Sequence, residues 1–270
     1  MAISAKDVMT LRQRTGVGMM ECKAALEETR GDFDAAIEML REKLKGDMEE
    51  RSDRQASEGA IAIARGDGSV AMIELLSETD FTGRNESFLA GAEKIAELAL
   101  ACNDGEVTLN SEMESIVDDL RITIKENITV GRGIKYSGGT LGSYLHHNHK
   151  IGAIIQGEGD MSEDLLRGLC QHIAAAVPPL VPQPLAVDEK GLAPELIDQQ
   201  KANFIEEAKD SGKPDSIIEK MVTGKLRKWI NENTLLGQTY IRELDAKKTV
   251  GSYLPDGATI QQFVRFELGA

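Results

Sequence analysis

The stretch that most invites a catalytic or metal-binding interpretation is His146-His147-Asn148-His149. Imidazole nitrogens are common zinc ligands, and a zinc site needs several ligands arranged around one ion. Successive side chains in an extended segment point to opposite faces, so these histidines converge on one ion only in a special loop. No cysteine lies nearby, and the next acid is Glu158. A metal site and a solvated hairpin loop both stay open; the loop is the simpler interpretation, and we predict no metal and no cofactor.

Other residue patterns typical of enzymes are missing from the sequence. The Gly-Lys pairs at 212–213 and 224–225 lack the upstream glycine and the following Ser or Thr of a phosphate-binding loop. The GGTLGS run at 138–143 precedes a strand-like pattern and is typical of a hairpin turn. No serine occupies a nucleophile elbow, and His172 lies in a helical pattern typical of a half-buried, hydrogen-bonded histidine. We therefore predict that the protein is not an enzyme.

A second unusual stretch is LLSETDFTGRNESFL at residues 75–89, where an apolar run stops at Asp80-Phe81 before a helical pattern begins. Phe81 suits a core anchor at a strand-to-helix corner, because large aromatic side chains are usually buried. In that interpretation Asp80 caps the following helix. In the alternative, the pair is displayed to something outside the chain. The residues alone favour the core anchor without excluding display.

Composition and charge limit the class of protein. The chain has 270 residues, 41% of them hydrophobic, which is typical of a globular protein with a sizeable core. Its three cysteines, Cys22, Cys102 and Cys170, are far apart, as expected for reduced thiols in the cytoplasm. No apolar run is long enough to span a membrane, and the N-terminus lacks the layout of a signal peptide. The net charge of -14 argues against nucleic acid and favours a basic patch on a protein partner.

Hydrophobic periodicity predicts an α+β fold. Helical spacing of apolar residues indicates three short helices within 4–44 and further helices at 85–102, 110–126, 162–177 and 188–231. Alternating or apolar runs indicate strands within 59–77, 127–145 and 150–160, and at GQTYIRE (237–243) and QQFVRFEL (261–268). Asp67-Gly68 between two of these runs predicts a β-hairpin.

These elements divide the chain into four predicted parts. We expect a three-helix module at 1–46, a charged linker at 47–58, a first α/β core subdomain at 59–139 and a second at 140–270. A protruding antiparallel helical hairpin is predicted as an insertion in the second subdomain, at about 188–231, because its arms are short and half-polar.

The second helix of the N-terminal module predicts which side chains face its core. Its apolar positions repeat at helical spacing through Met19, Cys22, Ala25 and Leu26. Neighbours on a helix lie about 100° apart, so Met19 and Met20 do not both face one core stripe. We therefore expect one of the two methionines to be exposed, which favours docking to a partner.

Several motifs together resemble the bacterial translation elongation factor Ts family. LRQRTGVGMMECKAAL and DFDAAIEMLR resemble the N-terminal module of that family, and TDF at 79–81 resembles a second motif. The others follow in the family's order: Glu126-Asn127-Ile128 with Arg132, LGSY with His146, KIG, HIAA, SGKP with IIEKMV, TVG and FVRFELG. The series covers essentially the whole chain.

The resemblance implies a UBA-like (ubiquitin-associated) N-terminal module and a guanine-nucleotide exchange factor for the GTPase elongation factor Tu. Such a factor binds the GDP form, disturbs the magnesium and phosphate site and promotes GDP release without covalent catalysis. The resemblance implies that the partner-binding wedge is formed by Thr79, Asp80, Phe81 and Thr82. Within it, Phe81 would enter an apolar pocket of the GTPase. Asp80 then lies near the magnesium-linked region.

The resemblance also implies contacts outside that motif. Arg12, Met19 and Met20 would contact a helix of the nucleotide-binding domain, and His146 the region near the phosphate loop. The second core subdomain and the C-terminal strand would hold another domain of the partner. The helical hairpin would add contact, and its self-association stays open.

One departure from the family pattern affects the wedge. The family usually follows TDF with a small apolar pair such as Val-Ala, whereas this chain has Thr82-Gly83. Glycine in a first helical turn costs about 0.5–1 kcal/mol relative to alanine, so we expect Gly83 to hold the wedge less rigidly. Two other functions stay open: a scaffold that sequesters a partner without accelerating exchange, and a metal-dependent hydrolase that uses the histidine loop.

Overall fold

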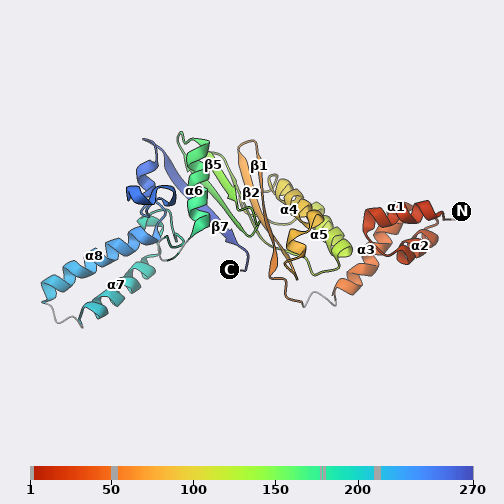
Figure 1. Ribbon diagram of the computed structural model, residues 1–270, viewed down its shortest axis with the longest axis horizontal. Helices are drawn as coiled ribbons and strands as arrows, with labels where there is room; N and C mark the ends of the chain where they lie inside the picture. Colours follow the sequence, from red (N-terminus) through yellow and green to blue (C-terminus); the bar gives the residue numbers. More distant parts are fainter. Residues whose placement is uncertain (1–2, 50–53, 177, 179–180, 210–213, 270) are drawn as a thin grey trace. The chain divides into compact units, whose positions relative to one another are not determined.

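The computed structural model describes residues 3–49, 54–176, 178, 181–209 and 214–269. Helices and paired strands both occur along the chain, which confirms the predicted α+β class (Figure 1). The chain divides into two compact units, unit 1 with Met1–Tyr136, Leu145–Gly152 and Phe266–Ala270, and unit 2 with Ser137–Tyr144 and Ala153–Arg265. Among the described helices, none is both long and apolar enough to cross a membrane.

Unit 1 begins with three helices, α1 (Ala5–Thr15), α2 (Met19–Glu28) and α3 (Phe33–Glu49). Ser4 caps α1, because its hydroxyl accepts a hydrogen bond from the Asp7 N–H at 3.2 Å while the Asp7 carboxylate accepts from the Ser4 N–H at 3.1 Å. Gly16 ends α1 at φ 65, a conformation that favours glycine. Helix α3 continues to Glu49, so the first residues of the predicted linker are helical.

The three N-terminal helices pack on a later helix of unit 1, α5 (Ser111–Ile124). Ile122 of α5 belongs to their apolar core, with Val8, Leu11, Val17, Cys22, Ala25, Leu26, Ala36 and Leu40. Arg41 of α3 donates two hydrogen bonds to the Asp119 carboxylate of α5, from Nε and from Nη2, both at 2.9 Å. An apolar contact and a bidentate ion pair therefore join these helices to α5.

The rest of unit 1 is built on a sheet of strand order β1-β2-β4-β3, from β1 (Glu58–Gly66), β2 (Ser69–Ser77), β3 (Gly105–Glu106) and β4 (Thr129–Ser137). The antiparallel pairing of β1 and β2 ends at Gly66↔Ser69, which confirms the hairpin predicted from Asp67-Gly68. Helix α4 (Glu86–Ala99) lies against β1 and β2, and α5 lies against α4 (Figure 1). Phe88, Ile95 and Met113 fill the core between them.

Most of a second sheet, of order β5-β6-β7, belongs to unit 2. It is formed by β5 (Thr140–Leu145), β6 (Ile151–Glu158) and β7 (Thr259–Glu267), and unit 2 also contains helix α6 (Glu163–Ala175). Short 3₁₀ helices occur at η2 (Glu189–Gly191), η3 (Ile241–Ala246) and η4 (Val250–Tyr253). Helices α7 (Pro194–Lys209) and α8 (Asp215–Asn233) run side by side (Figure 1). Lys225 joins them, since its Nζ lies 2.6 Å from the Glu207 carboxylate and 5.5 Å from the centre of the Phe204 ring.

A buried histidine connects α6 to the segment that follows α8. His172 is fully buried, and its Nδ1 accepts a hydrogen bond from the Ile241 N–H at 3.2 Å. The proton is therefore on Nε2, which donates to Gln238 Oε1 at 2.9 Å. Gln238 in turn donates to the carbonyl oxygens of Pro182 and Glu232, at 2.7 and 2.8 Å. Burial lowers the pKa of His172, with the Gln238 hydrogen bond acting in the opposite direction.

These contacts explain one wrong prediction. The run GQTYIRE was expected to be a strand, but it forms a single bridge at Thr239↔Thr249 and then enters η3. The Tyr240 N–H donates to the Lys248 carbonyl at 3.0 Å as part of this bridge. The next N–H, of Ile241, binds the His172 ring and is therefore not available to a sheet partner. The prediction for QQFVRFEL is confirmed, because it lies in β7.

Candidate functional site

The Asp80-Phe81 turn, residues 78–85, connects the end of β2 to the start of α4. Its first half is fixed through Thr79, which binds the Glu126 carboxylate twice: the backbone N–H donates at 3.1 Å and the hydroxyl at 2.7 Å. Buried Ser77 donates to the Thr79 carbonyl at 3.0 Å. Glu126 therefore clamps the turn at the point where the chain leaves the sheet.

The second half of the turn is the short 3₁₀ helix η1 (Thr82–Arg84). Asn85 ends it by donating its N–H to the Thr82 carbonyl at 2.9 Å, and the Asn85 side chain caps α4 by accepting from the N–H groups of Ser87 and Phe88. The cap of α4 is therefore Asn85, which excludes the alternative in which Asp80 caps this helix.

Gly83 in η1 allows a close approach between the turn and the sheet. A Cβ atom at this position would overlap the backbone of Gly59 in β1, and Thr82 and Gly83 are both buried. This differs from the expectation that Gly83 loosens the turn. Because Gly83 has no side chain, η1 packs directly on β1, and this contact restrains the turn.

The turn displays Phe81, whose side chain is 81% exposed. This exposure excludes the core-anchor interpretation of Phe81. Asp80 next to it forms an ion pair with Arg84, with 3.0 Å between Oδ2 and Nη2, and its side chain is 40% exposed. An aromatic side chain is therefore presented on a hydrogen-bonded turn beside a solvent-accessible carboxylate.

The N-terminal module displays a second group of exposed apolar side chains. Met19 and Met20 at the start of α2 are 50% and 76% exposed, and Met9 in α1 is 56% exposed. The expectation that the two neighbouring methionines do not both face the core is confirmed, and the structure exposes both of them. Arg12 of α1 is also exposed.

The histidine run forms the turn between β5 and β6. The His149 N–H donates to the His146 carbonyl, and the His146 N–H donates to the Ile151 carbonyl, both at 2.9 Å. The ring centroids of His146 and His147 lie 4.3 Å apart, and the two ring planes are tilted by 53°. Among the residues that the structure describes, no group of three His, Cys, Asp or Glu side chains is arranged to hold a metal ion.

All the residues singled out as a site from the sequence lie in unit 1. Thr79, Asp80, Phe81 and Thr82 come together in one turn, whereas Arg12, Met19 and Met20 belong to the N-terminal helices. His146 falls in Leu145–Gly152 and so in unit 1, although the boundary predicted at residue 140 assigns it to the second core subdomain.

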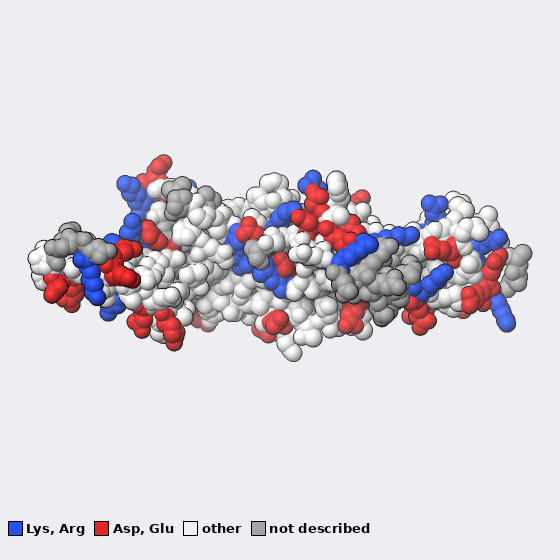
Figure 2. Space-filling model, turned by 90° about the horizontal axis from the view of Figure 1, so that it is seen from below, with Lys and Arg blue, Asp and Glu red and all other residues white. Residues whose placement is uncertain are grey.

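Charge is distributed without a dominant basic area on the face that Figure 2 draws, where lysines and arginines are interspersed with acids. A continuous basic stripe is the usual feature of a nucleic-acid interface. This face lacks such a stripe, in agreement with the net charge of -14.

Two residues important for the geometry are not identified as such by the sequence: Glu126 has no predicted role, and Gly83 is predicted to loosen the turn. Glu126 occurs in one of the motifs that carry the family resemblance, and this was the available signal. The packing role of Gly83 cannot be predicted from the sequence, because only the fold brings Gly83 next to Gly59.

Comparisons with known proteins agree with the resemblance. A family model described as Elongation factor TS matches residues 78–270. Elongation factor Ts of Alkalilimnicola ehrlichii is 43% identical over 281 residues, covering 100% of this chain and 93% of the relative. Elongation factor Ts of Thioalkalivibrio sulfidiphilus is 39% identical over 282 residues, with coverage of 100% and 93%, and that of Psychrobacter sp. is 40% identical over 276 residues, with coverage of 99% and 91%. The chain therefore belongs to the elongation factor Ts family, with the role of an elongation factor in protein biosynthesis.

Proposed function

We propose that the protein is a guanine-nucleotide exchange factor for elongation factor Tu and that Phe81 is the wedge that promotes GDP release. The observation that carries this proposal is the 81% exposure of Phe81 on a turn that Glu126 and β1 hold in place. An exposed aromatic side chain gains apolar contact area only when a partner covers it. Preorganisation of the turn lowers the entropy that is lost on binding.

Exchange follows from thermodynamic linkage and needs no covalent step. A factor that binds the nucleotide-free GTPase more tightly than the GDP form weakens GDP binding by the same ratio. Magnesium demands near-ideal geometry and bridges protein ligands to the phosphates, so a shift of about 1 Å is enough to disturb the site. Phe81 would cause this shift by entering an apolar pocket, with Asp80 beside it facing the magnesium-linked region.

The remaining contacts in the proposal hold the partner. Met19 and Met20 are exposed on α2, and methionine side chains adapt to an apolar docking surface at low cost. With Arg12 they would contact a helix of the nucleotide-binding domain, while His146 would contact the region near the phosphate loop. Unit 2 would hold another domain of the GTPase.

The experiment is the release of fluorescent GDP from elongation factor Tu, with the wild-type chain and the Phe81→Ala variant. We expect the wild type to accelerate release and Phe81→Ala to be slower. Surface truncations change stability by only about 0.5 kcal/mol, so the melting temperature should stay within about 2 °C. Glu93→Ala is the control, because Glu93 is an exposed residue of α4 in unit 1 to which the proposal gives no contact, and it should exchange like the wild type.

The other outcomes decide against parts of this proposal. No acceleration by the wild type contradicts the exchange function. Tight binding to the GTPase without acceleration favours the scaffold. A large drop in the melting temperature of Phe81→Ala would mean that Phe81 is a core residue after all.

A further inference from the structure

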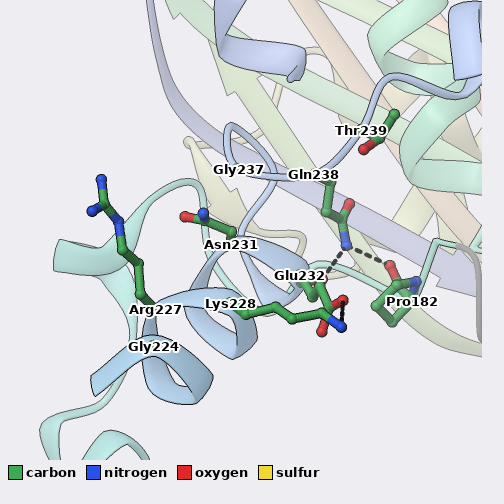
Figure 3. A pocket seen from close by; sticks show the side chains of 9 residues that line it. All are labelled: Pro182, Gly224, Arg227, Lys228, Asn231, Glu232, Gly237, Gln238 and Thr239. Carbon is green, nitrogen blue, oxygen red and sulfur yellow. Dashed lines mark hydrogen bonds and ion pairs between the residues drawn. The ribbon is translucent and has the colours of Figure 1, made fainter. Parts of the chain in front are cut away.

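A cleft of about 400 Å³ lies in unit 2, between helix α8 and the segment Gly237–Thr239 (Figure 3). Helix α8 contributes five lining residues at positions i, i+3, i+4, i+7 and i+8, which share one face of a helix. They are Gly224, Arg227, Lys228, Asn231 and Glu232. The cleft is thus an extended groove along one side of α8.

The opposite wall of the cleft is held firmly in place. Gly237 packs so closely on the end of α8 that a Cβ atom there would lie 2.7 Å from the Asn231 Cα. Gln238 is 3% exposed, and its amide donates to the carbonyl oxygens of Pro182 and Glu232 while His172 donates to its Oε1. Figure 3 shows the two hydrogen bonds from Gln238. The cleft is therefore preformed.

Hydrogen-bond donors without partners line this cleft. The side chains of Arg227, Asn231 and Thr239 make no hydrogen bond or ion pair with any other described residue. The Lys228 ammonium lies 3.6 Å from the Glu232 carboxylate, so those two charges offset each other. Arg227 leaves one positive charge unbalanced, and Figure 3 shows it projecting from the same side of α8 as Asn231.

Gly224 has no structural reason to be glycine. It lies inside α8, where glycine is less favourable than alanine. A Cβ atom at this position would meet nothing within 4 Å, so no neighbour excludes a side chain. What the glycine does provide is free space at the end of the cleft, beside Arg227 and Lys228.

We propose that this cleft binds a small oxyanion, a phosphate or carboxylate group, with Arg227 as its charged anchor. The guanidinium suits this ligand because its planar donors match two oxygens of a phosphate or a carboxylate. The Asn231 amide and the Thr239 hydroxyl supply further donors. The cleft lies in unit 2, whereas the turn that displays Phe81 lies in unit 1, and the proposal does not depend on the exchange function.

The test is a titration of the full chain with inorganic phosphate and, separately, with citrate, followed by amide chemical shifts at constant ionic strength. We expect saturable shifts confined to the residues that line the cleft. Arg227→Ala should weaken binding about tenfold or more, because it removes a charge-assisted hydrogen bond. Gly224→Leu should abolish binding by filling the cleft, and it should not lower the melting temperature, because it removes a helix glycine and meets no neighbour.

Lys220→Ala is the matched control, because it removes the same charge from an exposed position of α8 that does not line the cleft. It should leave the affinity within about twofold, since exposed charges several Å away are screened by solvent. Binding of phosphate alone identifies a phosphate site, and binding of citrate alone identifies a carboxylate site. Shifts that do not saturate with either anion overturn the proposal. So does an equal weakening by Lys220→Ala, or unchanged affinity in Gly224→Leu.

Discussion

Replacing Glu126 by alanine removes the clamp on the Asp80-Phe81 turn and leaves Phe81 itself unchanged. The carboxylate accepts hydrogen bonds from Thr79 at 3.1 and 2.7 Å. A hydrogen bond to a charged group contributes about 1.5–3 kcal/mol. Thr79 is exposed and Glu126 only partly buried, so solvent screening lowers this contribution to about 0.5–1 kcal/mol for each bond. The clamp as a whole then contributes about 1–2 kcal/mol.

Loss of the clamp should affect both stability and exchange. In the variant, the turn would have to regain its arrangement during association with the GTPase. The free-energy cost of this ordering equals the contribution of the two lost hydrogen bonds. A cost of about 1–2 kcal/mol corresponds to a factor of about 5–30, which we expect as the loss in kcat/KM for GDP release. The melting temperature of unit 1 should fall by about 2–8 °C.

The assay is release of fluorescent GDP from elongation factor Tu at subsaturating concentrations of the factor. Glu93→Ala removes the same charge from an exposed position on α4 that makes no hydrogen bond or ion pair with the described residues, so it should exchange like the wild type. Glu126→Gln keeps an acceptor for Thr79 and should be intermediate.

A double-variant cycle decides whether the clamp acts through Phe81. In a Phe81→Ala background, Glu126→Ala should cause no further loss of exchange, because the side chain that the clamp positions is already gone. A full additional loss in the double variant, or wild-type exchange in Glu126→Ala alone, would refute the reasoning.

Two further predictions concern pH and the N-terminal module. Burial lowers the pKa of His172 below its ordinary 6.5, so the unfolded chain binds this proton at higher pH than the folded chain does. The free energy of unfolding therefore has its full value at pH values above the pKa of His172 in the unfolded chain. It decreases as the pH falls below that pKa, by at most about 1.4 kcal/mol at pH 5.5. Urea unfolding at pH 7.5 and 5.5, monitored by the fluorescence of the single tryptophan, Trp229, checks this, and His172→Gln should remove that component. Arg41→Ala breaks the bidentate pair with Asp119 and should cost about 0.5–1 kcal/mol. Amide hydrogen exchange should then be faster in α1–α3 and unchanged in β1 and β2; equal exchange in α1–α3 of both proteins would contradict the role given to this pair.

Elements with strong local signals could be predicted from the sequence. Asp67-Gly68 between two alternating runs specifies a two-residue hairpin, and the structure has that turn with Gly68 at φ 65. The helices of the core begin where the periodicity changes, as at Asn85 before α4. In both cases the signal lies within a few residues of the element it determines.

Two of the errors, those for GQTYIRE and Gly83, have a common physical origin, because each depends on a residue far away in the sequence. The GQTYIRE run has strand-forming residues, but the backbone N–H of Ile241 is taken by His172, 69 residues earlier. From the sequence alone, Gly83 is expected to destabilise the start of a helix. The structure shows that it packs against the backbone of Gly59 in β1, where a side chain would not fit. Local patterns contain no information on such contacts. The sequence does not decide whether Phe81 is buried or displayed for the same reason, since its exposure depends on which other residues pack nearby.

Helix α5 links the N-terminal helices to the turn that displays Phe81. Near its end it holds the N-terminal helices through Asp119 and Ile122, and just after it Glu126 binds the turn that displays Phe81. Two contact areas on one packed body have a fixed spacing, so the first contact with a partner brings the second to a high effective concentration. If a flexible tether joined the two contact areas, the effective concentration of the second would be lower. The residence time of the partner would then depend on the stiffness of α5, a helix that itself touches nothing outside the chain in the proposed function.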